Sequence, residues 1–156
     1  MQITLPVILT LIAAALNGLL AGASLDQSLK QLPARHRMGV SAFSLYSRSA
    51  DLSHNGVIWY AFLGISAALL TLAAAVATFV SRSAHTLPIV LAAILSVLHS
   101  IATSQAAPTN FRQRKVLSDE AALAAVFDTF ERWQTLRVIL QVCTFALTLW
   151  AMVVLG

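Results

Sequence analysis

The last stretch of the chain, from Ser118 to Gly156, constrains the fold more than any other segment. No proline or glycine interrupts it before the terminal Gly156, and this pattern predicts one continuous helix. Ser118 is the expected N-cap, and Asp119 and Glu120 place negative charge where the helix dipole favours it. Such a helix is about 55 Å long, whereas a bilayer core is about 30 Å thick. Because no charged residue follows Arg137, we expect a transmembrane helix that extends beyond the bilayer on one side.

Composition places the whole chain in the same class. Of its 156 residues, 58% are hydrophobic and only 10% are charged, whereas soluble domains carry about 25% charge. The formal net charge of +4 is located in the segments between apolar runs, which favours a role in topology over nucleic-acid binding. The lone Cys143 excludes an internal disulfide and any chemistry that shuttles disulfides between cysteine pairs.

The apolar runs predict an all-α integral membrane four-helix bundle, with long, extended first and last helices and a short interfacial helix between spans one and two. We expect a single domain, 1–156, with spans at about 3–24, 57–80, 87–107 and 137–155. A cleaved signal peptide is the alternative for the first run. The lack of Lys or Arg before that run and its length favour a retained span.

Local signals predict where the helices end. Proline stops a helix, so we expect the first helix to end at Pro33 and the third at the segment that begins with Pro108. The Asn55-Gly56 pair predicts a turn before the second span. Helical spacing of Val40, Phe43 and Tyr46 predicts the interfacial helix.

Charge asymmetry predicts the orientation. With four spans, both termini lie on one side and the two long loops on the other, and nearly all Lys and Arg residues fall on the long-loop side. By the positive-inside rule we expect a multi-pass protein of a bacterial inner membrane, with cytoplasmic long loops and both termini outside.

Polar side chains fall at one depth in all four expected spans. His99 lies about 13 Å from the long-loop boundary, and Asn17, Ser66, Gln141 and Thr144 come to similar levels. Ionisable groups at membrane depth are functional candidates, and such a layer predicts a small pocket opening towards the long loops. The alternative that stays open is that these groups only hydrogen-bond between helices.

The sequence gives little support for metal binding or for nucleotide chemistry. The four histidines are scattered without zinc-like spacing, and nucleotide loops, nucleophile elbows and paired carboxylates are absent from the sequence. We expect no cofactor. Haem held by His99 and a loop histidine, or a bound quinone, remains an alternative.

The first half of the last helix carries an apolar stripe of Leu123, Phe127 and Phe130, with Trp133 and Arg137 on the same side. We expect the stripe to pack onto the interfacial helix. Arg137 is placed at the mouth of the expected pocket, where a guanidinium can hold an anionic or phenolic oxygen.

Several short motifs resemble the anthrone-oxygenase-like family of small four-span membrane proteins, also called domain of unknown function 1772. They are the Gly18/Gly22 first span leading into Leu32-Pro33-Ala34-Arg35, then Pro108-Thr109-Asn110, and Trp133-Gln134-x-x-Arg137. At the position of Gln134, members of the family often have His or Asn. Characterised relatives oxidise anthrones to anthraquinones with molecular oxygen and without an obvious bound cofactor.

The resemblance implies a membrane oxidoreductase that acts on an anthrone- or quinone-like aromatic. His99 or His36 would be the base, and Arg137 and Gln134 would stabilise the oxyanion. Trp133 would supply a stacking surface. Together with Trp133 and Gln134, the expected substrate-binding residues are Asn17, Arg35, Asn110 and Phe130.

The alternative function is a non-enzymatic membrane protein that binds or exports a lipid, a quinone or another hydrophobic small molecule. The expected spans hold no acidic residue for proton coupling, which counts against export. We expect a hydrophobic small molecule and membrane lipid as partners, and no nucleic acid. The ridge of Ala14, Gly18 and Gly22 could serve bundle packing or a homodimer.

Overall fold

Four helices, each long and apolar enough to cross a membrane, form the body of the protein. The structure is a computed structural model that describes residues 4–156, so the expected start of the first span at residue 3 lies outside the described residues. In chain order the elements are α1 (Leu5–Asp26), a π-helical turn (Gln27–Gln31), α2 (Leu32–Met38), α3 (Val40–Ser49), α4 (His54–Val80), α5 (Leu87–Phe111), a 3-10 turn (Arg112–Lys115) and α6 (Glu120–Leu155).

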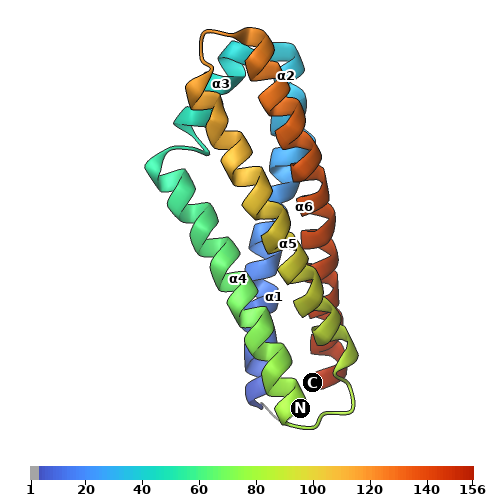
Figure 1. The fold of residues 1–156 in the computed structure, drawn as a ribbon. Coiled ribbons are helices and arrows are strands. Elements are labelled where there is room, and N and C mark those ends of the chain that lie inside the picture. The colour runs from blue at the N-terminus through green and yellow to red at the C-terminus, as the bar shows by residue number, and fades with distance from the viewer. Residues whose placement is uncertain (1–3) are drawn as a thin grey trace.

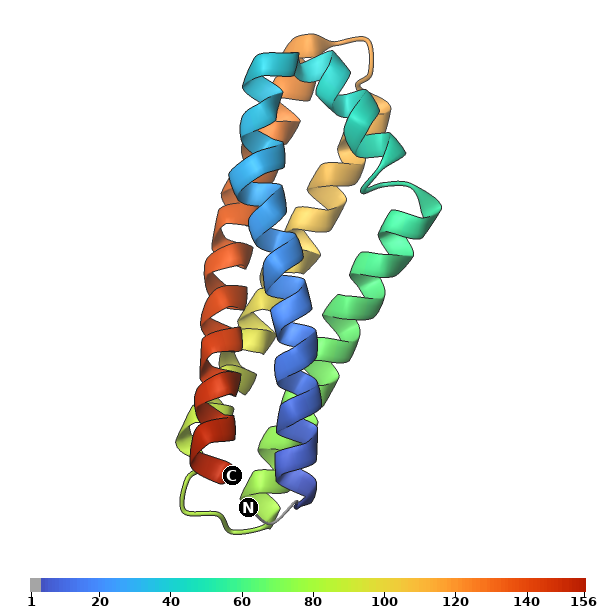
Figure 2. The ribbon, with the colours of Figure 1, turned by 180° about the vertical axis from the view of Figure 1, so that it is seen from behind.

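The four long helices run side by side, with the start of α1 and the end of α6 at the same end of the bundle (Figure 1). We call this end the terminal end, and the opposite end, formed by α2, α3 and the 3-10 turn, the loop end. α4 diverges from the other helices towards the loop end, as both side views show (Figure 2). The predicted all-α four-helix membrane bundle, with long first and last helices and a short helix after the first, is confirmed.

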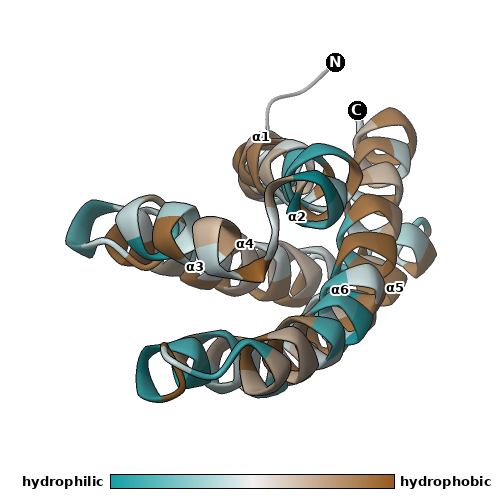
Figure 3. Cartoon of the chain, turned by 90° about the horizontal axis from the view of Figure 1, so that it is seen from above, coloured by the Kyte–Doolittle hydropathy of each residue, from teal (hydrophilic) through white to brown (hydrophobic). Residues whose placement is uncertain are grey.

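Hydropathy along the helices agrees with a membrane location for their middle and terminal parts. Seen from the loop end, hydrophilic residues gather on α2 and on the nearest part of α6, and hydrophobic residues predominate along the helices behind them (Figure 3). The 36-residue α6 is about 54 Å long at 1.5 Å per residue, so it extends beyond a bilayer core as expected.

Two predicted helix ends at proline are wrong. The first long helix passes Pro33 and ends only at Met38, and a π-helical turn ends two residues before the proline, at Gln31. The wider turn gives space to the pyrrolidine ring and removes the need for its missing N–H. Pro108 lies inside the last turn of α5, which continues to Phe111. There the lost backbone hydrogen bond affects only the end of the helix.

Two further local predictions need correction. Asn55 and Gly56 form the first turn of α4, and Ser53 caps this turn by accepting a hydrogen bond from the Gly56 N–H at 3.1 Å. A Cβ at position 56 would lie 2.3 Å from the carbonyl oxygen of Ala50, so glycine is needed for this close approach and not for a turn between elements. At α6 the N-cap is Asp119, one residue later than Ser118.

An apolar cluster closes the loop end. The edge of Phe43 in α3 meets the ring of Phe127 in α6, with centroids 5.0 Å apart. Around this pair lie Leu32, Leu123 and Phe130, so the predicted packing of the α6 stripe onto α3 is confirmed. Trp133 packs at the edge of the same cluster. The cluster therefore fixes α2 and α3 against α6.

The glycine ridge of α1 divides between two environments. A Cβ at Gly18 would lie 3.0 Å from Phe145 of α6, so this position permits close packing within the bundle. A Cβ at Gly22 would meet nothing within 4 Å, and Gly22 is exposed. Gly18 therefore serves packing within the bundle. Of the two glycines, only Gly22 is free to contact a second protein.

Candidate functional site

A cavity of about 660 Å³ lies between α4 and α5 and reaches α1 and α6 behind them. It extends from the segment before α4, at the loop end, down to the level of His99 in α5. A pocket at this depth, extending to the long-loop end, was expected from the polar layer. Its lining is mostly apolar and includes Leu20, Leu52, Val57, Ala61, Gly64, Ile65, Ala68, Leu69, Ala107, Pro108, Phe111 and Phe130.

Arg137 brings a cation to this cavity. Its Nε donates to the Thr103 hydroxyl oxygen at 3.0 Å, and its Nη1 donates to the Gln134 side-chain oxygen at 2.7 Å. Both partners are neutral, and no ion pair to Arg137 is found within residues 4–156. A guanidinium held by neutral groups in an apolar cavity retains its full attraction for an anionic or phenolic oxygen.

His99 lies one turn deeper on the same helix as Thr103. Its side chain is 5% exposed and lines the cavity, and its Nε2 is buried with no hydrogen-bond partner in the described part of the chain. The backbone beneath it is fixed, since the Thr103 hydroxyl donates to the His99 carbonyl at 2.9 Å. A buried nitrogen without a hydrogen-bond partner costs free energy. A ligand that donates a hydrogen bond to Nε2 would remove this cost and would therefore bind more tightly.

A carboxyl group lies at the loop end of the cavity. Asp51 accepts a hydrogen bond from Gln27 Nε2 at 3.0 Å, and both residues line the cavity. Burial raises the pKa of the Asp51 carboxyl above its ordinary value, against the opposing effect of the Gln27 hydrogen bond. Gln27 belongs to the π-helical turn, a feature often found at functional sites.

Four of the predicted site residues line this cavity, namely His99, Arg137, Asn110 and Phe130. Asn110 is 6% exposed, and its side-chain oxygen already accepts from Gln113 Nε2 at 2.7 Å. The structure therefore brings the predicted base, the predicted oxyanion partner and an aromatic side chain to one cavity.

Asn17 lies instead inside the bundle, where it links three helices. Its Nδ2 donates to the Thr71 hydroxyl of α4 at 2.9 Å, and its Oδ1 accepts from Gln141 Nε2 of α6 at 2.9 Å. Thr71, and not Ser66, supplies the α4 partner in this layer. The alternative that the polar groups join helices holds for Asn17 and Gln141.

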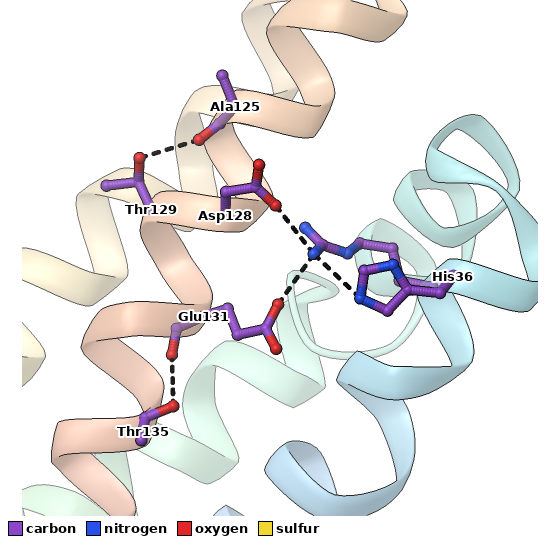
Figure 4. Close-up of polar contacts among 7 residues, drawn as sticks. His36, Ala125, Asp128, Thr129, Glu131 and Thr135 are labelled. Carbon is purple, nitrogen blue, oxygen red and sulfur yellow. Dashed lines mark hydrogen bonds and ion pairs between the residues drawn. The ribbon is translucent and has the colours of Figure 1, made fainter.

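Arg35 and His36 lie away from the cavity, at the loop end. Arg35 Nη2 is 2.9 Å from both an Asp128 and a Glu131 carboxylate oxygen of α6. His36 is exposed, and its Nε2 is 3.5 Å from the same Arg35 nitrogen (Figure 4). Both residues therefore belong to a cluster that joins α2 to α6, apart from the predicted site.

The remaining candidates, Trp133 and Gln134, do not line the cavity themselves but lie next to residues that do. Trp133 packs against the loop-end cluster. Gln134 is fully buried, and besides accepting from Arg137 it donates to the Ser24 carbonyl of α1 at 3.4 Å. Gln134 is therefore placed to orient Arg137.

The lining residues that sequence reasoning missed include Asp51, Gln27 and Tyr60, which carry polar groups. Asp51 carried one usable signal, because it is the only acidic residue between Pro33 and the second span. Gln27 carried none, since its place in the cavity depends on the packing of α1.

Within the described residues, no group of three or more His, Cys, Asp or Glu side chains is placed to hold a metal ion. No protein-family model, no curated protein and no solved structure matches this chain. Membership of the anthrone-oxygenase-like family therefore stays a prediction.

Proposed function

We propose that the protein is a membrane oxidoreductase that binds a hydrophobic aromatic molecule in the cavity and oxidises it with molecular oxygen. One observation carries the proposal: within residues 4–156, a guanidinium without a carboxylate partner and an imidazole nitrogen without any partner line the same apolar cavity. An enolisable aromatic, such as an anthrone, offers each of them a group to bind.

The proposed base is His99. With its proton on Nδ1, the imidazole presents Nε2 as an acceptor, and this nitrogen removes a proton from the activated CH₂ group of the substrate. The carbanion formed is delocalised onto the carbonyl oxygen of the substrate. Arg137 stabilises this developing oxyanion, held in place by Thr103 and Gln134.

The enolate then donates electrons to molecular oxygen, the oxidant. In the overall reaction a CH₂ group and O₂ give a C=O group and water, so the substrate carbon is oxidised and one oxygen atom leaves as water. The carbanion carbon forms a bond to O₂, and the proton held by His99 goes to the outer oxygen, which gives a hydroperoxide. Loss of the second C–H proton then breaks the O–O bond, and the outer oxygen leaves with both protons as water. The apolar lining limits access of water to the carbanion.

The proposal includes a location. α1 begins and α6 ends at one end of the bundle (Figure 1), and most Lys and Arg residues belong to the segments at or near the other end. We place the loop end, where the cavity begins, on the cytoplasmic side of a bacterial inner membrane, in line with the positive-inside rule.

The test is oxygen consumption by the detergent-purified protein with a dihydroxyanthrone. His99→Gln should lower kcat by about a hundredfold or more, because general base catalysis is lost while the cavity stays intact. The matched control is His85→Gln, which alters an exposed histidine in the loop between α4 and α5. Equal turnover by His99→Gln and the control protein would refute the catalytic role.

A second candidate function is non-enzymatic binding of a lipid or quinone. The mostly apolar lining of the cavity favours it, because such a lining accepts many hydrophobic molecules. It predicts that the protein binds the dihydroxyanthrone without consuming oxygen, and that His99→Gln leaves this binding unchanged.

A further inference from the structure

One wall of the cavity consists of side chains that are exposed on the surface of the bundle. On α4, Val57 is 37%, Ile65 60% and Leu69 61% exposed, yet all three line the cavity. A cavity enclosed by the bundle would be lined by buried side chains. The cavity therefore opens to the outside along α4.

The facing edge on α5 has the same character. Ser100, Ser104 and Pro108 line the cavity and are exposed. Nearer the terminal end the two helices are closely packed, where Ala74 of α4 joins Ile89 and Ala92 of α5 in a buried cluster. The opening is thus a wedge that widens towards the loop end, where α4 diverges (Figures 1 and 2). We call it the α4–α5 opening.

Small residues keep the opening wide. Gly64 lines the cavity, and a Cβ there would meet nothing within 4 Å. Ala61 and Ala68 lie one turn before and after it on α4. Because α4 and α5 are both long and apolar enough to cross a membrane, this opening faces lipid and not water.

Polarity changes from the opening inwards. The outer edge carries Ile65 and Leu69, whereas the inner wall carries His99, which is 5% exposed, and Arg137. A molecule that enters from the side would therefore place a polar head against the inner wall and leave an apolar part in the opening.

We propose that the ligand is a membrane-dissolved amphiphile that enters sideways from the bilayer through the α4–α5 opening. Its oxygen-bearing ring reaches Arg137 and His99, and its hydrocarbon tail stays in the opening, in contact with lipid. This inference rests on the proposed function, which it extends by naming the route of access and a tailed ligand class. The charge of Arg137, unpaired within residues 4–156, supplies the complementarity for the ring oxygen.

The test uses a decyl-substituted benzoquinol as the probe, with protein in lipid nanodiscs and binding measured by native mass spectrometry. Probe amounts are expressed per lipid, so that partitioning into the bilayer does not favour the longer tail. Gly64→Phe places a bulky ring in the opening without a clash at its Cβ. The matched control is Gly22→Phe, a change at the other open helix glycine, which is exposed and does not line the cavity.

We expect Gly64→Phe to weaken binding of the decyl probe by about tenfold or more, and Gly22→Phe to leave it unchanged, because only the first blocks the opening. The methyl-substituted analogue should bind more weakly than the decyl probe, since it leaves the opening unfilled. Binding by Gly64→Phe equal to wild type would overturn lateral access. Equal binding of the two probes would overturn the tailed ligand class.

Failure of this inference can be separated from failure of the proposed function. If Arg137→Gln weakens binding of the decyl probe and Gly64→Phe does not, the ring site stands and access through the α4–α5 opening is refuted. If Arg137→Gln and Gly64→Phe both bind the probe as wild type does, the cavity is not the binding site and both proposals fail.

Discussion

The ion-pair cluster at the loop end gives a stability prediction that runs against a simple count of contacts. Arg35 Nη2 lies 2.9 Å from carboxylate oxygens of Asp128 and Glu131 (Figure 4). The Arg35 guanidinium also lies over the Phe127 ring, with 5.9 Å to the centroid. The Arg35 side chain is only 4% exposed, whereas those of Asp128 and Glu131 are 62% and 39% exposed. The cation is buried and the anions are not.

This difference in burial determines how much each substitution should lower the free energy of unfolding. In Arg35→Met the apolar stem over Phe127 is kept, and the two carboxylates regain water, so the cost is about 2 kcal/mol, near that of hydrogen bonds to a charged group. In the double variant Asp128→Ala with Glu131→Ala the guanidinium stays buried without a counter-charge. Removing the partners of a buried charge costs about 3–5 kcal/mol. Removing the anions should therefore destabilise the protein more than removing the cation.

Thermal unfolding in detergent, followed by intrinsic tryptophan fluorescence, to which Trp133 beside the loop-end cluster contributes, measures both variants. The triple variant Arg35→Met, Asp128→Ala and Glu131→Ala should recover to about the stability of Arg35→Met, because no buried charge is left. A double variant more stable than Arg35→Met would refute the reasoning, since it would show that burial of the guanidinium carries little cost.

Three further predictions concern other parts of the bundle. Asn17→Ala should lower the free energy of unfolding by about 1–2 kcal/mol, because it removes the side chain that links α1 to α4 and α6; chemical denaturation in detergent measures this. Gly18→Ala should destabilise by about 1 kcal/mol against Phe145, whereas Gly22→Ala should be neutral or slightly stabilising, and equal thermal shifts would contradict the assigned packing. Because burial raises the pKa of Asp51 above 3.8, the folded state binds this proton more tightly, so its stabilising effect is complete below 3.8 and is lost as the pH rises through the raised folded value. Asp51→Asn should flatten the profile of Tm against pH in this window, and an unchanged profile would contradict the effect of burial.

Long-range features of the fold were predictable because they depend on runs of residues. Charge-free apolar runs predict four spans, and the α6 stripe predicts packing onto α3, since each signal sums over many side chains. Single-residue signals were weaker. Pro33 and Pro108 both lie within helices, because a π-helical turn in one case and a helix end in the other accommodate the ring.

The site was predictable only in part. His99 was recognised because ionisable groups at membrane depth are rare, and Arg137 because it falls at the mouth of the expected pocket, on the same side as Phe130 and Trp133. Whether Thr71 or Ser66 meets Asn17 depends on the rotation of α4 about its axis. Because α4 is apolar on all sides, its sequence does not determine this rotation. Asp51 and Gln27 meet at the cavity only because α1 packs beside the segment before α4.

Binding of a dihydroxyanthrone under anaerobic conditions tests the central claim most directly, because it separates recognition by Arg137 from turnover. The comparison is between wild type, Arg137→Gln and Arg132→Gln, an exposed arginine on the same helix. The account predicts that Arg137→Gln weakens binding by about tenfold or more, as expected for loss of a charged contact in an apolar cavity, and that Arg132→Gln binds as wild type does. Unchanged affinity in Arg137→Gln would contradict the account.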